Sequence, residues 1–439
     1  MLNFRVLVIF SCLLITKAVA QESLNVDQAI AIALENNYDL RIAKNNTELA
    51  DVQTGLLNSG YLPTVSATSG VNYSDENQNV QFLDQTSTSV DGAVTESYTA
   101  TITAEYVIFD GLVRKFTNQS NEENLNLAML QERQQIENSI ISIYDAYFNT
   151  AFQTQVVENL KLNLSNSKDR LDRAQRKLKY GQGTKLDELN AQVDLNNDSI
   201  SYIEAIRDLK NLKRSLNLLL GRNVAATFEV DTLVIFKPEI DKESIVQSAG
   251  KENIQVLLAN QNILLSELDI KINRAQFLPK ISGSGSYRWN ESQNPPTSFA
   301  LQNEAYGINL GLNLSWNVFN GSNSTNVKTA KITKRNREIE LVKAKEELVT
   351  DVLNSYETYS IAQFSLLAEK DNLNTNELNF ERSKKQYGLG QITSVEYRQA
   401  QINLFNSRNN YARSKFDLKI AEIDILQLAG RLLELDMTR

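Results

Sequence analysis

The hydrophobic positions along this chain follow a helical period and then an alternating one, and this order occurs twice. From a cap region near Asn25 and Asp27, apolar residues recur every three or four positions until Pro63, which predicts a helix. A second stretch with the same period runs from about Asp241 to Gln276. A proline follows each stretch and cannot continue a helix, so both helices are expected to end there.

Alternating residues follow each predicted helix and indicate strands. Residues 306–318 place Tyr, Ile, Leu, Trp and Val on one face against Gly, Asn and Ser on the other. Residues 65–69 and 98–108 alternate in a similar way, and the polar stretch 74–96 between them is expected to be largely loop. Such strands are typical of a soluble sandwich or of a membrane barrel. The contrast between the two faces suits lipid outside and water inside.

Aromatic residues bracket these apolar faces. In an outer-membrane barrel, aromatic side chains form girdles at both membrane interfaces. The predicted girdle residues are Tyr98, Tyr106, Tyr306 and Trp316.

Two strands in each half of the sequence make four transmembrane β-strands per chain. An open four-stranded sheet cannot lie in lipid because its edges would be unpaired, so the strands are expected to be shared between chains. Two chains would give eight strands and little lumen. Three chains giving twelve is the more natural closure.

After Gly111 and Gly321 the period is helical for about 66 to 70 residues, so each helix would be about 100 Å long if unbroken. Each long helix is expected to turn at glycines, at residues 181–183 and 388–390, and to return as a second helix. The pattern therefore predicts long antiparallel coiled-coil helix pairs.

Landmarks recur in the same order along the chain, which indicates a duplication. Pro63 matches Pro279 at an offset of 216 residues, Gly111 matches Gly321 at 210, Tyr180 matches Tyr387 at 207, and Leu220-Gly221 matches Ala429-Gly430 at 209. The predicted organisation is a signal peptide at 1–20, a first repeat at 21–222, a linker at 223–240 and a second repeat at 241–439. Each repeat contains a helix, two strands and a long helix pair.

Composition excludes much chemistry. The chain has no histidine, which removes imidazole bases, imidazole metal ligands and His-dependent nucleophiles. Its one cysteine, Cys12, lies in a leader with a basic start, an apolar stretch and an Ala18-Val19-Ala20 cleavage site, typical of a signal peptide. Ser11-Cys12 is also a weak lipid-attachment signal, which is the minority interpretation. We expect no metal, no cofactor and no enzymatic activity.

The charge balance argues against nucleic acid as a partner. The formal net charge is -8, and removal of residues 1–20 with Arg5 and Lys17 would make it -10.

These features together resemble the TolC-like outer-membrane efflux protein family. The resemblance rests on the twofold order of Tyr61-Leu62-Pro63 and Phe277-Leu278-Pro279, the Phe109-Asp110-Gly111 and Phe319-Asn320-Gly321 junctions, and the glycine turns. It covers essentially the whole mature chain. The resemblance implies a mainly α fold with a small β part: a homotrimer in which a 12-stranded β-barrel continues into a 12-helix periplasmic tunnel, in the outer membrane of a Gram-negative bacterium. It also implies a periplasmic adaptor (membrane fusion) protein and an inner-membrane pump of the RND, ABC or similar class as partners.

The family's functional region is the periplasmic tip, and the resemblance carries specific residues over to it. Gate or constriction residues would be Asp187, Glu396 and Gln399, although Gln399 is uncharged. An acid in the first turn of a helix is also a common capping residue, so capping remains an alternative for both carboxylates. Adaptor-binding tip residues would be Tyr180, Gly181, Gly183, Thr184, Lys185, Tyr387, Gly388, Gly390, Ile392 and Thr393.

The resulting hypothesis is a trimeric outer-membrane channel of a tripartite efflux or type I secretion system. It would passively conduct substrates exported by an inner-membrane pump, with a gate at its helical tip. The alternative is a structural or adhesive coiled-coil surface protein without transport activity.

Overall fold

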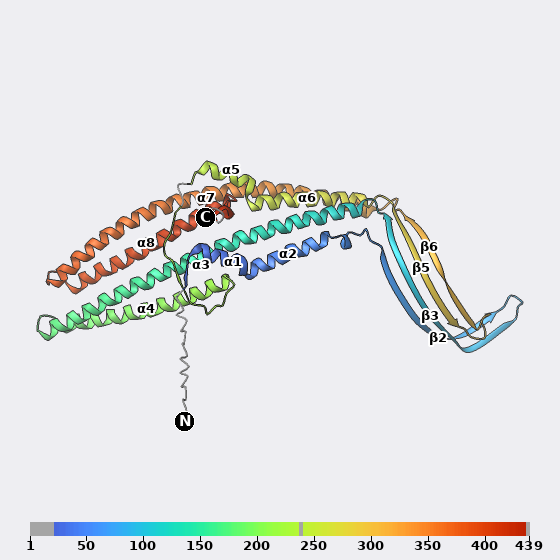
Figure 1. Cartoon of the computed structure of the whole chain (residues 1–439), viewed down its shortest axis with the longest axis horizontal. Coiled ribbons are helices and arrows are strands. Elements are labelled where there is room, and N and C mark those ends of the chain that lie inside the picture. The colour runs from blue at the N-terminus through green and yellow to red at the C-terminus, as the bar shows by residue number, and fades with distance from the viewer. Residues whose placement is uncertain (1–21, 237–239, 436–439) are drawn as a thin grey trace, which may run out of the picture. The chain divides into compact units, whose positions relative to one another are not determined.

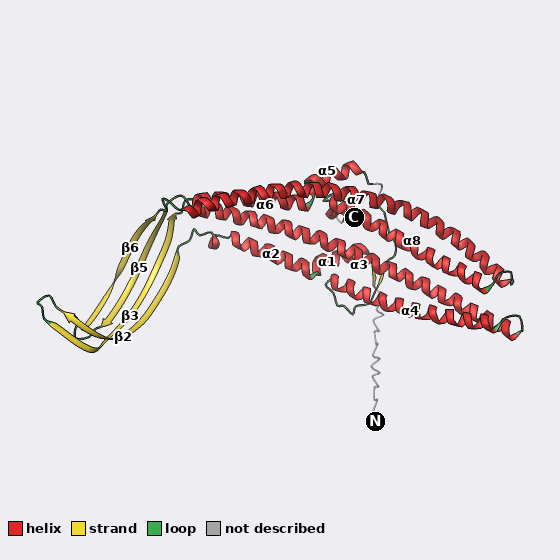
Figure 2. Cartoon of the chain, turned by 180° about the vertical axis from the view of Figure 1, so that it is seen from behind, coloured by secondary structure: helices red, strands yellow, loops and turns green. Residues whose placement is uncertain are grey.

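The structure is a computed structural model, and it describes residues 22–236 and 240–435. Helices make up most of the chain and strands a smaller part (Figure 2). The predicted signal peptide at 1–20, including Cys12 and its possible lipidation, lies outside the described residues. Among the helices that are described, none is both long enough and apolar enough to cross a membrane.

The element order runs twice through a helix pair, a strand pair and a long helix pair (Figure 1). The first pass consists of α1 (Val26–Asn36), α2 (Tyr38–Thr54), the 3-10 helix η1 (Leu56–Asn58), β2 (Thr64–Gln81), β3 (Ser87–Phe109), α3 (Val113–Lys179) and α4 (Lys185–Leu219). The second consists of α5 (Lys242–Glu252), α6 (Ile254–Ala275), β5 (Lys280–Gln293), β6 (Gln302–Ser315), α7 (Gly321–Gly388) and α8 (Ser394–Leu428), followed by η2 (Leu432–Leu435).

The first helix of each pass is broken at an asparagine, whereas the sequence pattern predicted one continuous helix. Asn37 accepts hydrogen bonds through its side-chain oxygen from the backbone N–H groups of Asp39 and Leu40, at 2.8 and 3.0 Å. Asn253 accepts from the Gln255 N–H at 2.9 Å in the same way. The asparagine side chain replaces the helical hydrogen bonds at the break and caps the helix that follows. The predicted cap at Asn25 is confirmed, because its side chain accepts from the Gln28 N–H.

The four long strands form one antiparallel sheet in the order β2-β3-β5-β6. The expected loop at 74–96 is wrong, because β2 and β3 pair out to Gln81 and Ser87 and leave only residues 82–86 as the turn. Backbone hydrogen bonds hold this polar extension, and they do not require apolar side chains. At the other end, β6 stops at Ser315, so Trp316 lies just beyond the strand and not within it.

The two faces of this sheet differ in chemistry, and the pairing register defines them because paired residues share a face. One face carries rows such as Val65, Ala104, Gly285 and Leu310. The other face carries rows of hydroxyl, amide and glycine residues, such as Ser66, Thr103, Ser286 and Asn309.

The chain divides into two compact units, and α3 and α7 contribute to both. The strand-bearing unit consists of residues 42–134 and 249–349 and contains the sheet. The helical unit consists of residues 1–41, 135–248 and 350–439, within which the structure describes residues 22–41, 135–236, 240–248 and 350–435. The main core of the helical unit gathers Ile30, Ile143, Phe148, Leu216, Phe416, Ile423 and their neighbours.

The predicted linker at 223–240 contains a strand that the sequence pattern did not reveal. This strand, β4 (Phe228–Val230), pairs in parallel with β1 (Glu22–Leu24). The buried Tyr147 hydroxyl donates to the carbonyls of Leu24 and Asp231, at 2.9 and 3.0 Å. The linker is thus tied into the helical unit, although its residues 237–239 lie outside the described part of the chain.

Candidate functional site at the hairpin turns

The first hairpin turn joins α3 to α4 and depends on two glycines. Gly181 has a φ of +70°, a left-handed conformation that favours glycine, and its N–H donates to the carbonyl of Leu178. The next N–H, from Gln182, donates back to the Lys177 carbonyl at 2.8 Å. A Cβ at Gly183 would approach the Lys177 Cβ to 2.9 Å, so this turn packs too closely for a larger residue.

The second turn repeats this design between α7 and α8. Gly390 has a φ of +73°, and the Gln391 N–H donates to the carbonyl of Gln386. Gly181 therefore corresponds to Gly390, an offset of 209 residues. The sequence matched Gly181 with Gly388 at 207, which is wrong at this point because Gly388 still belongs to α7.

Both predicted gate carboxylates lie in capping boxes. The Thr184 side chain accepts from the Asp187 N–H at 3.1 Å, and the Asp187 carboxylate accepts from the Thr184 hydroxyl at 2.7 Å. Glu396 and Thr393 are arranged in the same way, at 3.2 and 2.8 Å. In addition, the Thr393 N–H donates to the Glu396 carboxylate at 2.7 Å. These contacts show the capping role considered for both residues.

Two hydrogen bonds hold the pKa of the Glu396 carboxyl below its usual value. The larger effect comes from the Thr393 N–H and the smaller from the Thr393 hydroxyl. Glu396 is exposed, so its charge faces solvent. The third predicted gate residue, Gln399, is also exposed and donates from its side-chain amide to Asn403 at 2.8 Å along α8.

The predicted adaptor-binding residues are mostly at the surface of the two turns. Tyr180, Gly181, Thr184, Lys185, Gly388, Gly390 and Thr393 are exposed, and Gly183 and Ile392 are partly buried. Lys185 forms an ion pair with Glu188 at 2.5 Å.

Tyr387 departs from the predicted tip surface, because its side chain is only 5% exposed. Its ring stacks on Tyr397 with centroids 4.8 Å apart, and Tyr397 stacks in turn on Phe380 at 5.7 Å. The Lys177 ammonium of the first hairpin lies 5.0 Å from the centre of the Tyr387 ring. Tyr387 therefore joins the two hairpins in a cation–π contact.

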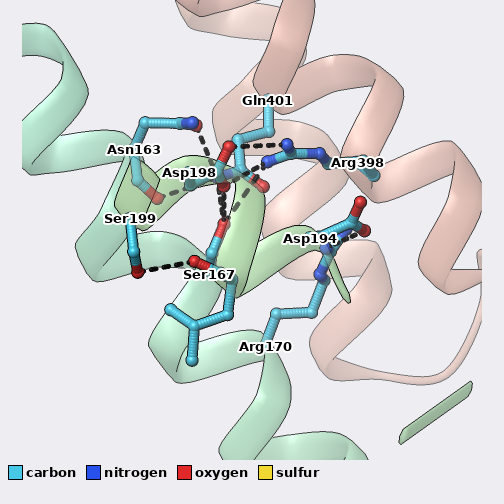
Figure 3. A network of polar contacts seen from close by, with 9 residues as sticks. Asn163, Ser167, Arg170, Asp194, Asp198, Ser199, Arg398 and Gln401 are labelled. Atoms are coloured by element: carbon cyan, nitrogen blue, oxygen red, sulfur yellow. Dashed lines mark hydrogen bonds and ion pairs between the residues drawn. The ribbon is translucent and has the colours of Figure 1, made fainter. Parts of the chain in front are cut away.

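A buried polar network connects the two hairpins near these turns (Figure 3). Arg398 on α8 donates from its two terminal nitrogens to the two carboxylate oxygens of Asp198 on α4, both at 2.8 Å. The Ser167 hydroxyl on α3 also donates to Asp198. Gln401 donates from its amide to the Asn163 side-chain oxygen at 2.7 Å and to Ser167 at 3.2 Å. The network thus contains residues from α3, α4 and α8.

The sequence analysis missed this network, although one residue could have indicated it. Ser167 interrupts the apolar seam of α3, and it is fully buried at the centre of the network. Within the first hairpin, the buried Arg170 forms a further ion pair with Asp194. Arg398 and Asp198 are about 200 positions apart, so no local spacing indicates their contact.

The predicted girdle residues lie at the two ends of the apolar face or beside it. Tyr306 pairs with Trp289 across β6 and β5, and Tyr98 lies one row further out. Tyr106 lies near the opposite end, and the Trp316 indole donates to the Phe277 carbonyl at 3.0 Å. Trp289 is a further aromatic residue at this border that the sequence analysis did not single out.

Residues 22–236 and 240–435 contain no group of three or more Cys, Asp or Glu side chains placed to hold a metal ion. The hairpin turns and the network beside them therefore offer surface for contact, charge and hydrogen bonds, and the described residues supply no metal-binding cluster.

Several known proteins are similar to this chain in sequence or in structure. The chain is 23% identical over 418 residues to the toluene efflux pump outer membrane protein TtgC of Pseudomonas putida, covering 92% of this chain and 82% of that protein. It is 20% identical over 301 residues to the outer membrane protein TolC of Vibrio cholerae, covering 68% and 69% of the two chains. The crystal structure of the Campylobacter jejuni outer membrane channel CmeC superposes with a TM-score of 0.77 at 15% identity, covering 93% of this chain and 86% of that one.

The sequence model of the outer membrane efflux protein family matches residues 29–222 and 245–431, which together span most of the chain. The two matched stretches contain all the predicted gate and tip residues. The chain therefore belongs to the outer membrane efflux protein family.

Proposed function

We propose that three copies of this chain form an outer-membrane channel, which conducts substrates passively from an inner-membrane pump and its periplasmic adaptor. The observation that carries this proposal is the four-stranded sheet. It has an apolar face, a face of hydroxyls and amides, and free edges at β2 and β6. In water, the apolar face of such a sheet would be exposed. In lipid, its outer edges would leave backbone groups unpaired.

Pairing of β2 in one chain with β6 of the next removes both edges at once. Repetition of that contact around a threefold axis gives twelve strands in a closed barrel. The apolar face then contacts lipid, and the hydroxyl face lines a water-filled passage.

Exposed apolar seams on the helices support assembly with neighbouring copies. One seam runs along α2 at Ile42, Leu49 and Val52 and continues to Leu56 in η1, and all four residues are more than half exposed. A seam with the same spacing of seven and three runs along α7 at Ile332, Ile339 and Val342. This is the spacing of coiled-coil packing, and a single chain leaves both seams uncovered. In the helical unit, α4 carries a similar seam at Leu186, Leu189, Val193, Ile200 and Ile203.

The family and the relatives support a role in export. The matching family model is named for outer membrane efflux, and TtgC is named as the outer membrane protein of a toluene efflux pump. In this proposal the chain carries out no chemistry, and the energy for transport comes from the pump.

We place the adaptor contact at the two hairpin turns and the gate at the acids beside them, the exposed Glu396 and the half-buried Asp187. A carboxylate near the axis of a trimer is repeated three times at short distance, so it attracts cations, and a cation held between the three carboxylates keeps the passage narrow. Glu396 suits this role because it is exposed and because hydrogen bonds from Thr393 hold the pKa of its carboxyl below the usual value. Asp187 occupies the corresponding position in the first turn.

Single-channel conductance of the purified protein in a planar bilayer tests the proposal, with the wild type compared to the Glu396→Ala variant. Small, cation-selective openings that grow in the variant are the expected result. Size measurement in detergent should show a trimer. The absence of conductance from both proteins, despite trimers in the membrane, would contradict the channel and favour a structural coiled-coil role.

A further inference from the structure

The polar face of the sheet carries an isolated positive charge, Arg288 on β5. The pairing register places Arg288 in one row with Thr68 on β2, Thr101 on β3 and Gly307 on β6. Side chains of residues paired in this way lie on the same face of the sheet. Arg288 is therefore on the face that lines the passage in the proposed barrel.

The rows on both sides of Arg288 are uncharged. Towards one end of the strands, the next row on this face contains Ser66, Thr103, Ser286 and Asn309. Towards the other end, it contains Gly70, Thr99, Asn290 and Ala305. Among the twelve residues of these three rows, Arg288 has the only charged side chain.

The Arg288 side chain is also free to act on solutes. It is exposed, and no described residue forms an ion pair or hydrogen bond with it. A Cβ on its neighbour Gly307 would meet no atom within 4 Å, so there is open space beside it. A guanidinium stays protonated in proteins, which makes this charge permanent.

We propose that Arg288 sets the local charge preference of the barrel lumen and favours anionic over cationic solutes in this part of the channel. The inference rests on the proposed function, since the barrel repeats Arg288 three times around the lumen. A charge without a counter-ion raises the local concentration of oppositely charged solutes and lowers that of like-charged ones. The nearest acid on this face is Glu105, which pairs with Ser284 two rows away from Arg288.

This preference is separate from the charge at the hairpin turns. Conductance through the whole channel reports its narrowest part, so Arg288 requires a local probe. The chain has one cysteine, Cys12, and a Cys12→Ser background therefore allows a single new thiol to be placed beside Arg288. Thr101 is the direct partner of Arg288 and has a side chain of similar size to cysteine.

The experiment measures how fast the Thr101→Cys variant in proteoliposomes reacts with two thiosulfonate reagents, one anionic (sulfonatoethyl) and one cationic (trimethylammonioethyl). The ratio of the two rate constants reports the local potential. At 10 mM salt, we expect Arg288→Gln to lower the anionic-to-cationic ratio about fivefold, the size expected for a unit charge roughly 8 Å away in water. At 1 M salt, where the screening length is about 3 Å, the difference should nearly disappear.

Two controls separate this inference from the proposed function. Arg337→Gln removes the same charge from α7, where Arg337 pairs with Glu340, and should leave the ratio unchanged. Ile102→Cys places the thiol on the apolar face and should react far more slowly than Thr101→Cys. Equal reaction at both positions would contradict the assignment of the faces, and with it the proposed barrel.

A ratio that does not change with Arg288→Gln, at a Thr101→Cys thiol that reacts readily, would overturn the role of Arg288 and leave the channel intact. Failure of Thr101→Cys to react with either reagent would also overturn it, because the row would then not face water. If Thr101→Cys does not fold, Thr103→Cys in the adjacent row provides the same measurement.

Discussion

The guanidinium of Arg398 binds both carboxylate oxygens of Asp198, and this contact joins α8 of the second hairpin to α4 of the first. Both side chains are largely buried, with 17% and 8% exposed. A buried ion pair contributes little net stability compared with a well-packed apolar pair, but removal of one partner leaves the other charge uncompensated. The pair therefore makes the contact between the hairpins specific.

Arg398→Met should strongly destabilise the helical unit. The Asp198 carboxylate would remain buried, and among the described side chains only the Ser167 hydroxyl would still donate to it, a loss that costs about 3–5 kcal/mol. Thermal unfolding followed by circular dichroism measures the effect. Arg408→Met is the matched control on the same helix, because its partly exposed pair with Glu377 is worth about 1 kcal/mol or less.

The double variant Arg398→Met/Asp198→Leu should recover most of the lost stability, because it removes both charges together. A melting temperature as low as that of Arg398→Met alone would show that the ion pair is not the source of the effect.

Gly221→Ala should prevent normal folding of the chain. A Cβ at this position would lie 2.1 Å from the carbonyl oxygen of Asn36, and the φ of +66° adds strain. Gly390→Ala is the matched control, since its φ is +73° but no atom lies within 4 Å of the added Cβ. We expect this control to fold with a loss of about 1–2 kcal/mol, the cost of the left-handed conformation. Similar yields of folded protein from both variants would contradict the close approach at Gly221.

Asp424→Asn should stabilise the protein at neutral pH. Burial raises the pKa of the Asp424 carboxyl, and the negative charge of Asp145 raises it further. A raised pKa in the folded state favours folding below the ordinary pKa of aspartate, and this contribution is lost as the pH rises through the folded-state pKa. Replacement of the acid should therefore increase the melting temperature at pH 7 and have a smaller effect near pH 4.

The exposed Asp371 on α7 provides the control for Asp424→Asn. Asp371→Asn changes the net charge by the same amount without relieving burial, and should shift the melting temperature little at either pH. A stabilisation at pH 4 as large as that at pH 7 would contradict the titration argument.

The sequence pattern predicted helices and strands correctly where the same requirement, such as an apolar face or a glycine turn, applies to neighbouring residues. The alternation at 306–314 predicted β6, because one face of that strand is apolar from Tyr306 to Leu314. Glycine marked the ends of α3 and α7, since Gly181 and Gly390 adopt the left-handed conformation there. The outer half of the β2–β3 hairpin was missed, because backbone pairing holds it and most of its side chains are polar.

The candidate site was harder to predict. The sequence pointed to Asp187 and Glu396 as gate residues, which stays a prediction, and it offered as an alternative the capping role that the structure shows. The aromatic stack that buries Tyr387 and the Arg398–Asp198 pair depend on contact between hairpins about 200 residues apart in sequence. Such contacts produce no periodic pattern in the sequence. The break at Asn37 was also missed, because an asparagine interrupts a helix only where its side chain caps the next one.

Two substitutions at the second turn should separate the charge of Glu396 from its capping role. In Glu396→Gln, the amide oxygen still accepts hydrogen bonds from the Thr393 N–H and hydroxyl, so the start of α8 should stay ordered while the charge is lost. In Thr393→Val, the charge remains, but the hydroxyl that accepts from the Glu396 N–H is lost. Hydrogen exchange at the first turn of α8 should therefore accelerate in Thr393→Val and not in Glu396→Gln.

Ion selectivity should show the opposite pattern to hydrogen exchange, and the stability of the cap should depend on pH. Because the Thr393 contacts lower the pKa of Glu396, the cap is stable above the ordinary pKa of glutamate and weakens as the pH falls through the lowered value. Cation preference in planar bilayers should fall in Glu396→Gln and persist in Thr393→Val. If Thr393→Val abolished the cation preference while Glu396→Gln kept it, the carboxylate would act at this turn only as a cap, and the charge at the gate would have to come from Asp187.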